Sequence, residues 1–413
     1  MRGRGTFIGW TGVFAFFMLV LATGEHAVAQ QETLLHSFNL TGNSGADVVV
    51  GVISDAAGNL YGVTGARGGS LSGNAFELVR GADGSWTEKT IHDFNATLND
   101  GEWPDGSLIF DAAGNLYGTT YYGGRYNMGT AFELVPQSDG SWKEKILHHF
   151  GATSFDGTAP RASLTFDPAG NLYGTTFTGG ADNDGTVFEL TPRGDGSWTE
   201  KILHAFNGKN GAYLLAGLAM DPAGDLYGVT ISGGPSDAGN VFELMPVSGG
   251  GWIYKVLHNF NLSGDGEGAF GTPILDAAGN LYGTTTQGGS FGYGTVYALK
   301  RRAGGQWVHR ILHNFANDAV TGIDPYASLI FDAAGNLYGT AEEGGAYNGG
   351  VVFELMPRAG GGWTEVVLHN FNPGGGDGEF PLCALIFDSS GNLYGTTDSG
   401  GAYGYGTVFK LTP

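Results

Sequence analysis

Hydrophobic positions along the chain come in short runs that are separated by polar, glycine-rich segments. Val, Ile, Thr, Tyr and Phe fill these runs, and no window of helical length shows an apolar period of 3.6 residues. In one representative stretch the pattern predicts strands over residues 162–166, 171–176, 186–191 and 198–206. The segment from Asp167 to Asn171 predicts a hairpin turn, because Asp accepts backbone N–H groups while Gly and Asn tolerate positive φ. We therefore expect an all-β protein.

The same four-strand pattern recurs along the chain. A phrase of the form D-x-x-G-[N/D]-L-Y-G begins at Asp55, Asp111, Asp167, Asp221, Asp276, Asp332 and Asp388. Successive starts lie 54 to 56 residues apart. Four-stranded units repeated at this interval are typical of the blades of a β-propeller. We expect a seven-bladed β-propeller, formed by residues 30–413 as a single domain.

The order of the strands predicts how the ring closes. The segment containing Phe409 reads as a third strand with no fourth strand after it, whereas the strand at residues 33–38 has no blade before it. Pairing the two would complete the last blade and cover an edge that otherwise invites aggregation. We expect the amino-terminal strand to take this place.

Composition and charge exclude several kinds of partner. The 413 residues include 19 Lys+Arg and 40 Asp+Glu, which gives a net charge of −21. A charge of this sign argues against nucleic acid and anionic membranes as partners. The one cysteine, Cys383, cannot form an internal disulfide, and we expect it to be a small buried thiol. We expect the protein to be a monomer.

The amino terminus has the layout of a secretory signal peptide. Arg2 and Arg4 precede an apolar stretch from Phe7 to Ala22, and small residues end the segment at Ala29. The alternative is an uncleaved anchor, because the apolar stretch is only slightly shorter than the roughly 17 to 25 residues that span a bilayer. We expect residues 1–29 to be removed and the mature chain, with no membrane span, to be extracellular or periplasmic.

The repeat unit resembles a known family. Its phrases "ASLIFDAAGNLYGTT", "GTVFEL" and "VLHNF" are similar to the tandem repeat of the bacterial choice-of-anchor tandem repeat GloVer-containing proteins. The resemblance spans essentially the whole mature chain. It implies an exported protein of unassigned biochemical function, and it supplies no catalytic residue.

Residues that repeat in every unit predict structural roles. We interpret the aspartates of the D-x-x-G phrase as turn acceptors, and the tryptophans such as Trp198 as core between blades. A histidine recurs in the phrase hydrophobic-His-x-Phe, at His36, His92, His148, His204, His258, His313 and His369. The fourth strand of a blade lies farthest from the propeller axis, so the seven imidazoles could not converge on one ion. We expect them to pack in the core or to form hydrogen bonds between strands.

Residues that differ between units are the better guide to function. The loops from fourth to first strands and from second to third strands emerge on one face of a propeller, and in this sequence they combine carboxylates with aromatic rings. Our candidate ligand-binding residues are Glu102, Trp103, Asp105, Tyr126, Glu267, Phe270, Tyr293, Tyr326, Glu379 and Phe380. Carboxylates suit calcium, the one cofactor this pattern favours, and aromatic rings stack on sugars.

Two functions from different classes fit this face. The first is a non-enzymatic binding or interaction module for a polysaccharide or a surface protein, and this is the interpretation we favour. The second is a polysaccharide hydrolase or lyase that uses a carboxylate pair such as Glu102 with Glu267 or Glu379. The distance between the two carboxyl groups would distinguish the two functions, because the carboxyl groups of glycosidases lie about 5 to 9.5 Å apart. A quinone-dependent dehydrogenase is disfavoured, because the propellers of that class have eight blades and a different tryptophan repeat, whereas this chain has seven units.

Overall fold

The fold is built from antiparallel strands alone. The computed structural model describes residues 31–39, 44–48, 50–67, 72–95, 99–261 and 264–412; the expected signal peptide lies outside these ranges. Within them, the only helical element is the short 3₁₀ turn η1, Pro373–Gly375. No helix in the described part of the chain is both long and apolar enough to cross a membrane.

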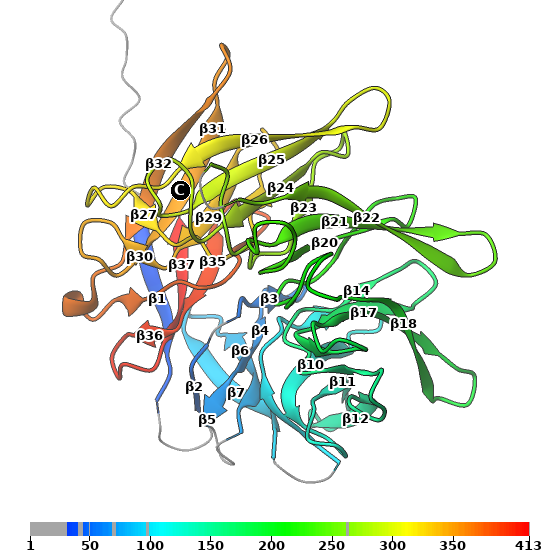
Figure 1. Cartoon of the computed structure of the whole chain (residues 1–413). Helices are drawn as coiled ribbons and strands as arrows, with labels where there is room; N and C mark the ends of the chain where they lie inside the picture. Colours follow the sequence, from blue (N-terminus) through cyan, green and yellow to red (C-terminus); the bar gives the residue numbers. More distant parts are fainter. Residues whose placement is uncertain are drawn as a thin grey trace, which may run out of the picture.

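Seven four-stranded sheets follow one another around a ring in sequence order, which confirms the predicted seven-bladed β-propeller (Figure 1). The first strands are β3 (Ile53–Ser54), β9 (Ile109–Phe110), β14 (Thr165–Phe166), β19 (Ala219–Met220), β23 (Ile274–Leu275), β28 (Ile330–Phe331) and β34 (Ile386–Phe387). The second strands are β4 (Leu60–Thr64), β10 (Leu116–Gly123), β15 (Leu172–Thr176), β20 (Leu226–Thr230), β24 (Leu281–Thr285), β29 (Leu337–Ala341) and β35 (Leu393–Thr397).

The third and fourth strands are longer than the first strands. The third strands are β6 (Asn74–Arg80), β11 (Thr130–Pro136), β17 (Thr186–Pro192), β21 (Asn240–Val247), β25 (Thr295–Arg301), β31 (Val351–Pro357) and β37 (Thr407–Thr412). The fourth strands are β7 (Trp86–Asp93), β12 (Trp142–His149), β18 (Trp198–Ala205), β22 (Gly251–Asn259), β26 (Trp307–Asn314), β32 (Trp363–Asn370) and β1 (Gln31–Ser37).

Short extra strands join the loop before a blade to the end of that blade's second strand. They form the pairs β2 (Gly45–Ala46) with β5 (Ala66–Arg67), β13 (Gly157–Thr158) with β16 (Thr178–Gly179), β27 (Gly322–Ile323) with β30 (Glu343–Gly344), and β33 (Gly378–Glu379) with β36 (Ser399–Gly400). In the second blade β8 (Gly101–Pro104) pairs directly with β10. These pairs hold the variable loops in defined positions.

The first and last strands of the chain meet in one sheet. The amino-terminal strand β1 pairs antiparallel with β37, with Gln31 opposite Thr412 and Ser37 opposite Thr407, and Figure 1 shows the two side by side. Beyond the strand, Phe38 is fully buried and its ring lies 5.1 Å from that of Phe76 in the first blade. The sheet therefore joins the two ends of the chain, and the core contact joins the last blade to the first.

The core lies between neighbouring blades. The phenylalanine of each His-x-Phe phrase packs on the third strand of the next blade, as Phe94 does with its ring 5.0 Å from that of Phe132. The tryptophans face the preceding blade, as Trp142 does 6.1 Å from Tyr61, which confirms their predicted place in the core. Gly118 has no room for a side chain, because a Cβ there would lie 2.6 Å from Phe132 Cζ. This close approach explains the glycine of the L-Y-G phrase.

The repeated aspartates close the hairpin between the first two strands. Asp111 Oδ1 accepts the N–H groups of Ala113 and Asn115 at 2.8 and 2.9 Å, and its Oδ2 accepts the Asn115 amide at 2.8 Å. The Tyr117 hydroxyl lies 3.2 Å from the same Oδ2 and 2.9 Å from Glu133 Oε1, and its one proton is shared between these two acceptors. The predicted turn role is confirmed, and the bonds tie the turn to the third strand.

Candidate functional site

A left-handed residue recurs at one position in the loop that precedes each first strand. The seven residues are Asp47, Trp103, Ala159, Tyr213, Gly268, Asp324 and Phe380, with φ between 56° and 68°. Glycine is the residue that favours this conformation, and bulky side chains adopt it rarely. The backbone conformation therefore does not explain the rings at Trp103, Tyr213 and Phe380. Backbone strain of this kind clusters at functional sites.

A cavity of about 540 Å³ lies on the propeller axis, since residues of all seven blades line it. Side chains that distinguish the blades surround it: Asp105, Arg161, Phe270, Tyr326, Glu342 and Leu382. Each of them follows or faces a left-handed position. We call the end of the cavity that these residues form the channel mouth.

Aromatic rings of the second blade lie beside the channel mouth, in contact with its residue Arg161. The Trp103 ring, 44% exposed, meets Tyr122 edge-on at 5.6 Å, and the Tyr122 ring lies 4.1 Å from Tyr121. The Arg161 guanidinium sits 4.8 Å over the Tyr121 ring, and its Nε donates a hydrogen bond to Asp105. Burial raises the pKa of Asp105, although the Arg161 charge opposes the shift. We call this set of contacts the aromatic sector.

Carboxyl groups gather around Glu342, which lines the channel mouth. Asp47, Asp324, Glu342, Glu343, Glu379 and Asp398 lie in the first, sixth and seventh blades, and we call them the acidic sector. Burial, followed by the charges of Glu343, Asp324 and Asp398, raises the pKa of Glu342 to about 7. Burial, Asp47 and Glu379 raise the pKa of Asp398 to about 6. In both cases the charged neighbours that shift the pKa are carboxylates, so the carboxyl groups of this sector repel one another.

Further exposed rings lie in the loops between second and third strands, and we call them the outer rings. They occupy one equivalent position after the paired glycines of the loops between second and third strands: Tyr126, Phe291, Tyr347 and Tyr403. Each is at least 43% exposed. Three of them lie in consecutive blades, the fifth to the seventh, so a long ligand that leaves the channel mouth on that side would meet rings at regular intervals.

The structure brings together only part of the predicted site. Asp105, Phe270 and Tyr326 line the cavity, and the rings of Phe270 and Tyr326 lie 4.4 Å apart. Trp103 belongs to the aromatic sector, and Tyr126 to the outer rings. Phe380 is a left-handed residue whose carbonyl accepts the N–H of Asp398 at 3.0 Å.

The remaining predicted residues are Tyr293 and three glutamates, of which Glu379 belongs to the acidic sector. Tyr293 packs against the core between two blades. Glu102, Glu267 and Glu379 lie opposite Tyr122, Gln287 and Ser399 in three different blades. Within the described ranges no contact joins Glu102 to either of the other two glutamates.

Sequence reasoning missed Arg161, Glu342 and Asp398. Glu342 and Asp398 directly follow the second strand, where other blades carry Tyr121, Phe177, Ile231 or Thr286. Aligning the seven units on the L-Y-G phrase would have shown two acids at a position that is uncharged in the other five units. Arg161 would have stood out as the one cation at the position that Asp105 and Tyr326 occupy in their own units.

The histidines of the fourth strands form a second group of candidates. Each lies between its own blade and the next and faces a residue of the next fourth strand, and in the described part of the chain five of them also face a residue of the loop between the two strands. The sets are His36 with Glu88; His92 with Asp100 and Glu144; His148 with Asp156 and Glu200; His204 with Asn210 and Tyr254; His258 with Asp265 and His309; His313 with Glu365; and His369 with Asp377 and Glu32. The predicted separation of the seven imidazoles is confirmed. The hydrogen bonds of His92, His204, His258 and His369 go to residues of the following loop rather than to a neighbouring strand.

A β-bulge explains why one strand serves two blades. In β12, Glu144 and His148 are four residues apart and would share a face in a regular strand. The pairing register shifts between Ala131 and Phe132, so β12 contains one extra residue there. After this bulge the side chains of β12 alternate in the opposite sense, and each points to the other face of the sheet. Glu144 therefore faces His92 of the preceding blade, whereas His148 faces Glu200 of the next.

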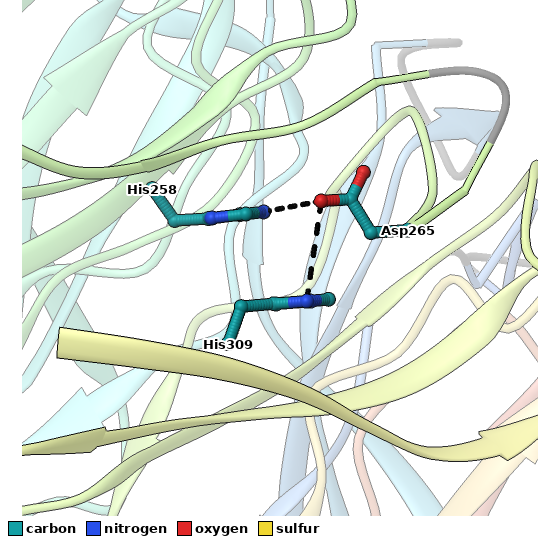
Figure 2. Close-up of side chains that lie close together, drawn as sticks. All are labelled: His258, Asp265 and His309. Atoms are coloured by element: carbon teal, nitrogen blue, oxygen red, sulfur yellow. Dashed lines mark hydrogen bonds and ion pairs between the residues drawn. The ribbon is translucent and has the colours of Figure 1, made fainter.

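Figure 2 shows the set with two histidines. His258 Nε2 lies 2.7 Å from Asp265 Oδ2, and His309 Nδ1 lies 3.9 Å from the same oxygen. The two rings are stacked 4.2 Å apart with an angle of 2° between their planes. Burial and the neighbouring His258 lower the pKa of His309 to about 4, so this imidazole is neutral at physiological pH.

Comparisons with known proteins agree with the fold. The repeat family described as the Gloeobacter/Verrucomicrobia repeat matches residues 16–242 and 195–409. No curated protein matches the chain.

Among solved structures, the extracellular domain of a putative hybrid two-component system from B. thetaiotaomicron is similar with a TM-score of 0.54 and 11% identity, over 92% of this chain and 39% of that one. A puromycin-hydrolyzing peptidase of Mycobacterium tuberculosis is similar with a TM-score of 0.53 and 12% identity, over 88% of this chain and 52% of that one. The chain thus spans about half or less of these proteins, and at such identities the likeness concerns the fold alone.

Proposed function

Since the chain belongs to the Gloeobacter/Verrucomicrobia repeat family and forms one propeller with a cavity on its axis, we propose that it is a binding module that holds a polysaccharide at the channel mouth. The observation that carries the proposal is the aromatic sector. Its Trp103 ring is exposed although its position requires no ring, and exposed planar rings stack on the apolar faces of sugars.

The acidic sector restricts the class of polysaccharide. Carboxylates accept hydrogen bonds from sugar hydroxyls, but they repel polymers that carry their own carboxylates or sulfates. Among the described residues, the only cation that lines the cavity is Arg161, which is already paired with Asp105. The ligand is therefore a neutral or basic polysaccharide. The predicted signal peptide and the extracellular setting named for one structural neighbour support a place outside the cytoplasm, where such polymers occur.

A binding panel tests the proposal. The purified protein is incubated with insoluble cellulose, chitin, chitosan and cross-linked alginate, each with calcium and with a chelator, and the bound fraction is measured. We expect retention on a neutral or basic polymer and none on alginate. Retention on alginate alone, or on no member of the panel, would contradict the proposal, and loss of binding in the chelator arm would assign calcium a part in it.

One observation favours a second candidate, a polysaccharide hydrolase. Glu342 lines the cavity and has a pKa of about 7, so a large share of it is protonated at neutral pH. A carboxylic acid in this state is what a glycosidase uses to protonate the leaving oxygen. If the protein releases reducing sugar from a bound polymer, Glu342→Gln should abolish release and preserve binding. Unchanged release in that variant would rule out this assignment.

A further inference from the structure

Three of the seven inter-blade sets combine a histidine, an aspartate and a glutamate, and in two of these the described structure brings all three ligand atoms close together. His92, Asp100 and Glu144 form one, and His148, Asp156 and Glu200 form the other. In each, the histidine ends a fourth strand, the aspartate precedes the next blade, and the glutamate comes from that blade's fourth strand. In each set the three ligand atoms lie within 4.8 Å of one another. These clusters lie between blades rather than at the channel mouth.

The distances in these two sets are at or beyond the upper limit for a hydrogen bond. His148 Nε2 lies 3.6 Å from Asp156 Oδ2 and 3.5 Å from Glu200 Oε2. His92 Nε2 lies 3.5 and 3.7 Å from its two carboxylates. By contrast, His369 Nε2 lies 2.9 Å from Asp377, a hydrogen bond. Two atoms bound to one tetrahedral ion at about 2.1 Å are roughly 3.4 Å apart, close to the spacing in both sets.

Burial leaves polar atoms of the second set without partners. The Asp156 side chain is 4% exposed, and its Oδ1 has no hydrogen-bond partner. His148 Nε2 and Glu200 Oε1 are also buried without one. The backbone N–H of Ala152 donates to Asp156 Oδ2 at 2.8 Å and holds the carboxylate in place. Buried polar groups of this kind call for an additional partner.

We propose that these two sets each bind a first-row divalent cation, of which Zn²⁺ is the best match, between adjacent blades. One imidazole and two carboxylates are borderline and hard ligands that suit Zn²⁺, whereas Ca²⁺ prefers oxygen atoms alone. Two carboxylates also neutralise a divalent charge. The His148 and Glu200 side chains are 18% and 14% exposed, so water can reach the ion and complete its coordination.

Other sets lack the geometry or the ligands. The rings of His258 and His309 lie in parallel planes, so their in-plane lone pairs cannot point at one ion. His204 faces Asn210 and Tyr254, and its ring is stacked on that tyrosine at 4.0 Å. These sets occupy the same place between blades but have neutral or hydrogen-bonded partners. Substitutions in them are therefore matched controls for the two proposed metal sites.

Isothermal titration of the full-length protein with Zn²⁺, after removal of metals by a chelator, tests the proposal. We expect two zinc ions per chain, and a rise in melting temperature with zinc because the ions bridge folded blades. Asp100→Asn and Asp156→Asn should each remove one ion, and the double variant both, whereas the control Asp265→Asn should leave two. Glu200→Gln provides a second probe if Asp156→Asn folds poorly.

Cobalt supplies an independent readout. Co²⁺ at these sets should give visible absorption bands that the double variant lacks. A protein that binds no zinc would overturn the proposal and leave the clusters as proton-sharing contacts. Two ions retained in a folded double variant, or an ion lost in Asp265→Asn, would place the binding elsewhere and overturn it as well.

Discussion

The backbone N–H of Glu342 donates a hydrogen bond of 3.1 Å to the carbonyl oxygen of Asp324, which sets two carboxyl groups beside each other at the channel mouth. The pairing follows from the left-handed turn at Asp324, which aims its carbonyl at the residue after the second strand. Burial and the neighbouring carboxylates then raise the pKa of Glu342 to about 7. The folded protein therefore favours the protonated acid.

This shift makes stability depend on pH. Because the pKa of Glu342 is higher in the folded state than the ordinary value of 4.5, its contribution is fully present below pH 4.5 and is lost as pH rises through 7. Glu342→Gln, which cannot ionise, should raise the melting temperature at pH 8 and leave it nearly unchanged at pH 4.5. Melting curves at the two pH values check this, and an equal shift at both would mean that ionisation of Glu342 does not cause the pH dependence.

The aromatic sector and Phe380 should matter for binding more than for stability. Trp103→Ala combined with Phe380→Ala should weaken binding to the retained polysaccharide at least tenfold, about 1.4 kcal/mol, with little change in melting temperature. Val320→Ala, at a residue that is 65% exposed, is the matched control. A collapsed melting temperature with intact binding would mean that these rings support the loops and that the ligand binds elsewhere.

Phe38 should be essential for joining the last blade to the first. Its ring is fully buried against Phe76, and Phe38→Ala should lower the free energy of unfolding by about 3 to 5 kcal/mol through the cavity it leaves. Phe155, which is 69% exposed, supplies the control, since Phe155→Ala should change stability little. Chemical denaturation measures both, and equal effects would mean that the contact contributes nothing.

The turn aspartates should stabilise the fold without touching the ligand. Asp332 accepts bonds from the N–H groups of Ala334 and Asn336 and from the Tyr338 hydroxyl. Asp332→Ala should cost about 0.5 to 2 kcal/mol of unfolding free energy, with polysaccharide binding unchanged in the folded fraction. Loss of binding in a fully folded variant would show that this turn has a functional role.

The repeats made the fold predictable from the sequence, because each unit carries its own turn and strand signals. The aspartate turn at Asp111 and the core position of Trp142 follow from local chemistry alone. Phe270 and Tyr326 were recognised as candidates because they depart from the repeat, and their rings do meet.

The rest of the site depends on geometry that local patterns do not contain. Glu342 reaches the channel mouth through a hydrogen bond to a left-handed residue, and hydrophobic alternation carries no sign of that turn. A bulge places His148 and Glu144 on opposite faces of the sheet, although the regular alternation of a strand predicts that they share one face. Tyr293 illustrates a further dependence on geometry, since this aromatic residue of a variable loop is partly buried and packs against the core between two blades.

The pairing of β1 with β37 also has a consequence for synthesis. Strand β1 leaves the ribosome long before its partner exists: the N–H of Ala402 bonds to Ser37 Oγ across 365 residues of chain. Until residues 407–412 are made, six blades can fold but the seventh has an open edge and the ring has a gap. A premature stop within the last few codons should therefore damage the protein as severely as one much earlier, because the final strand acts as the latch for the whole ring.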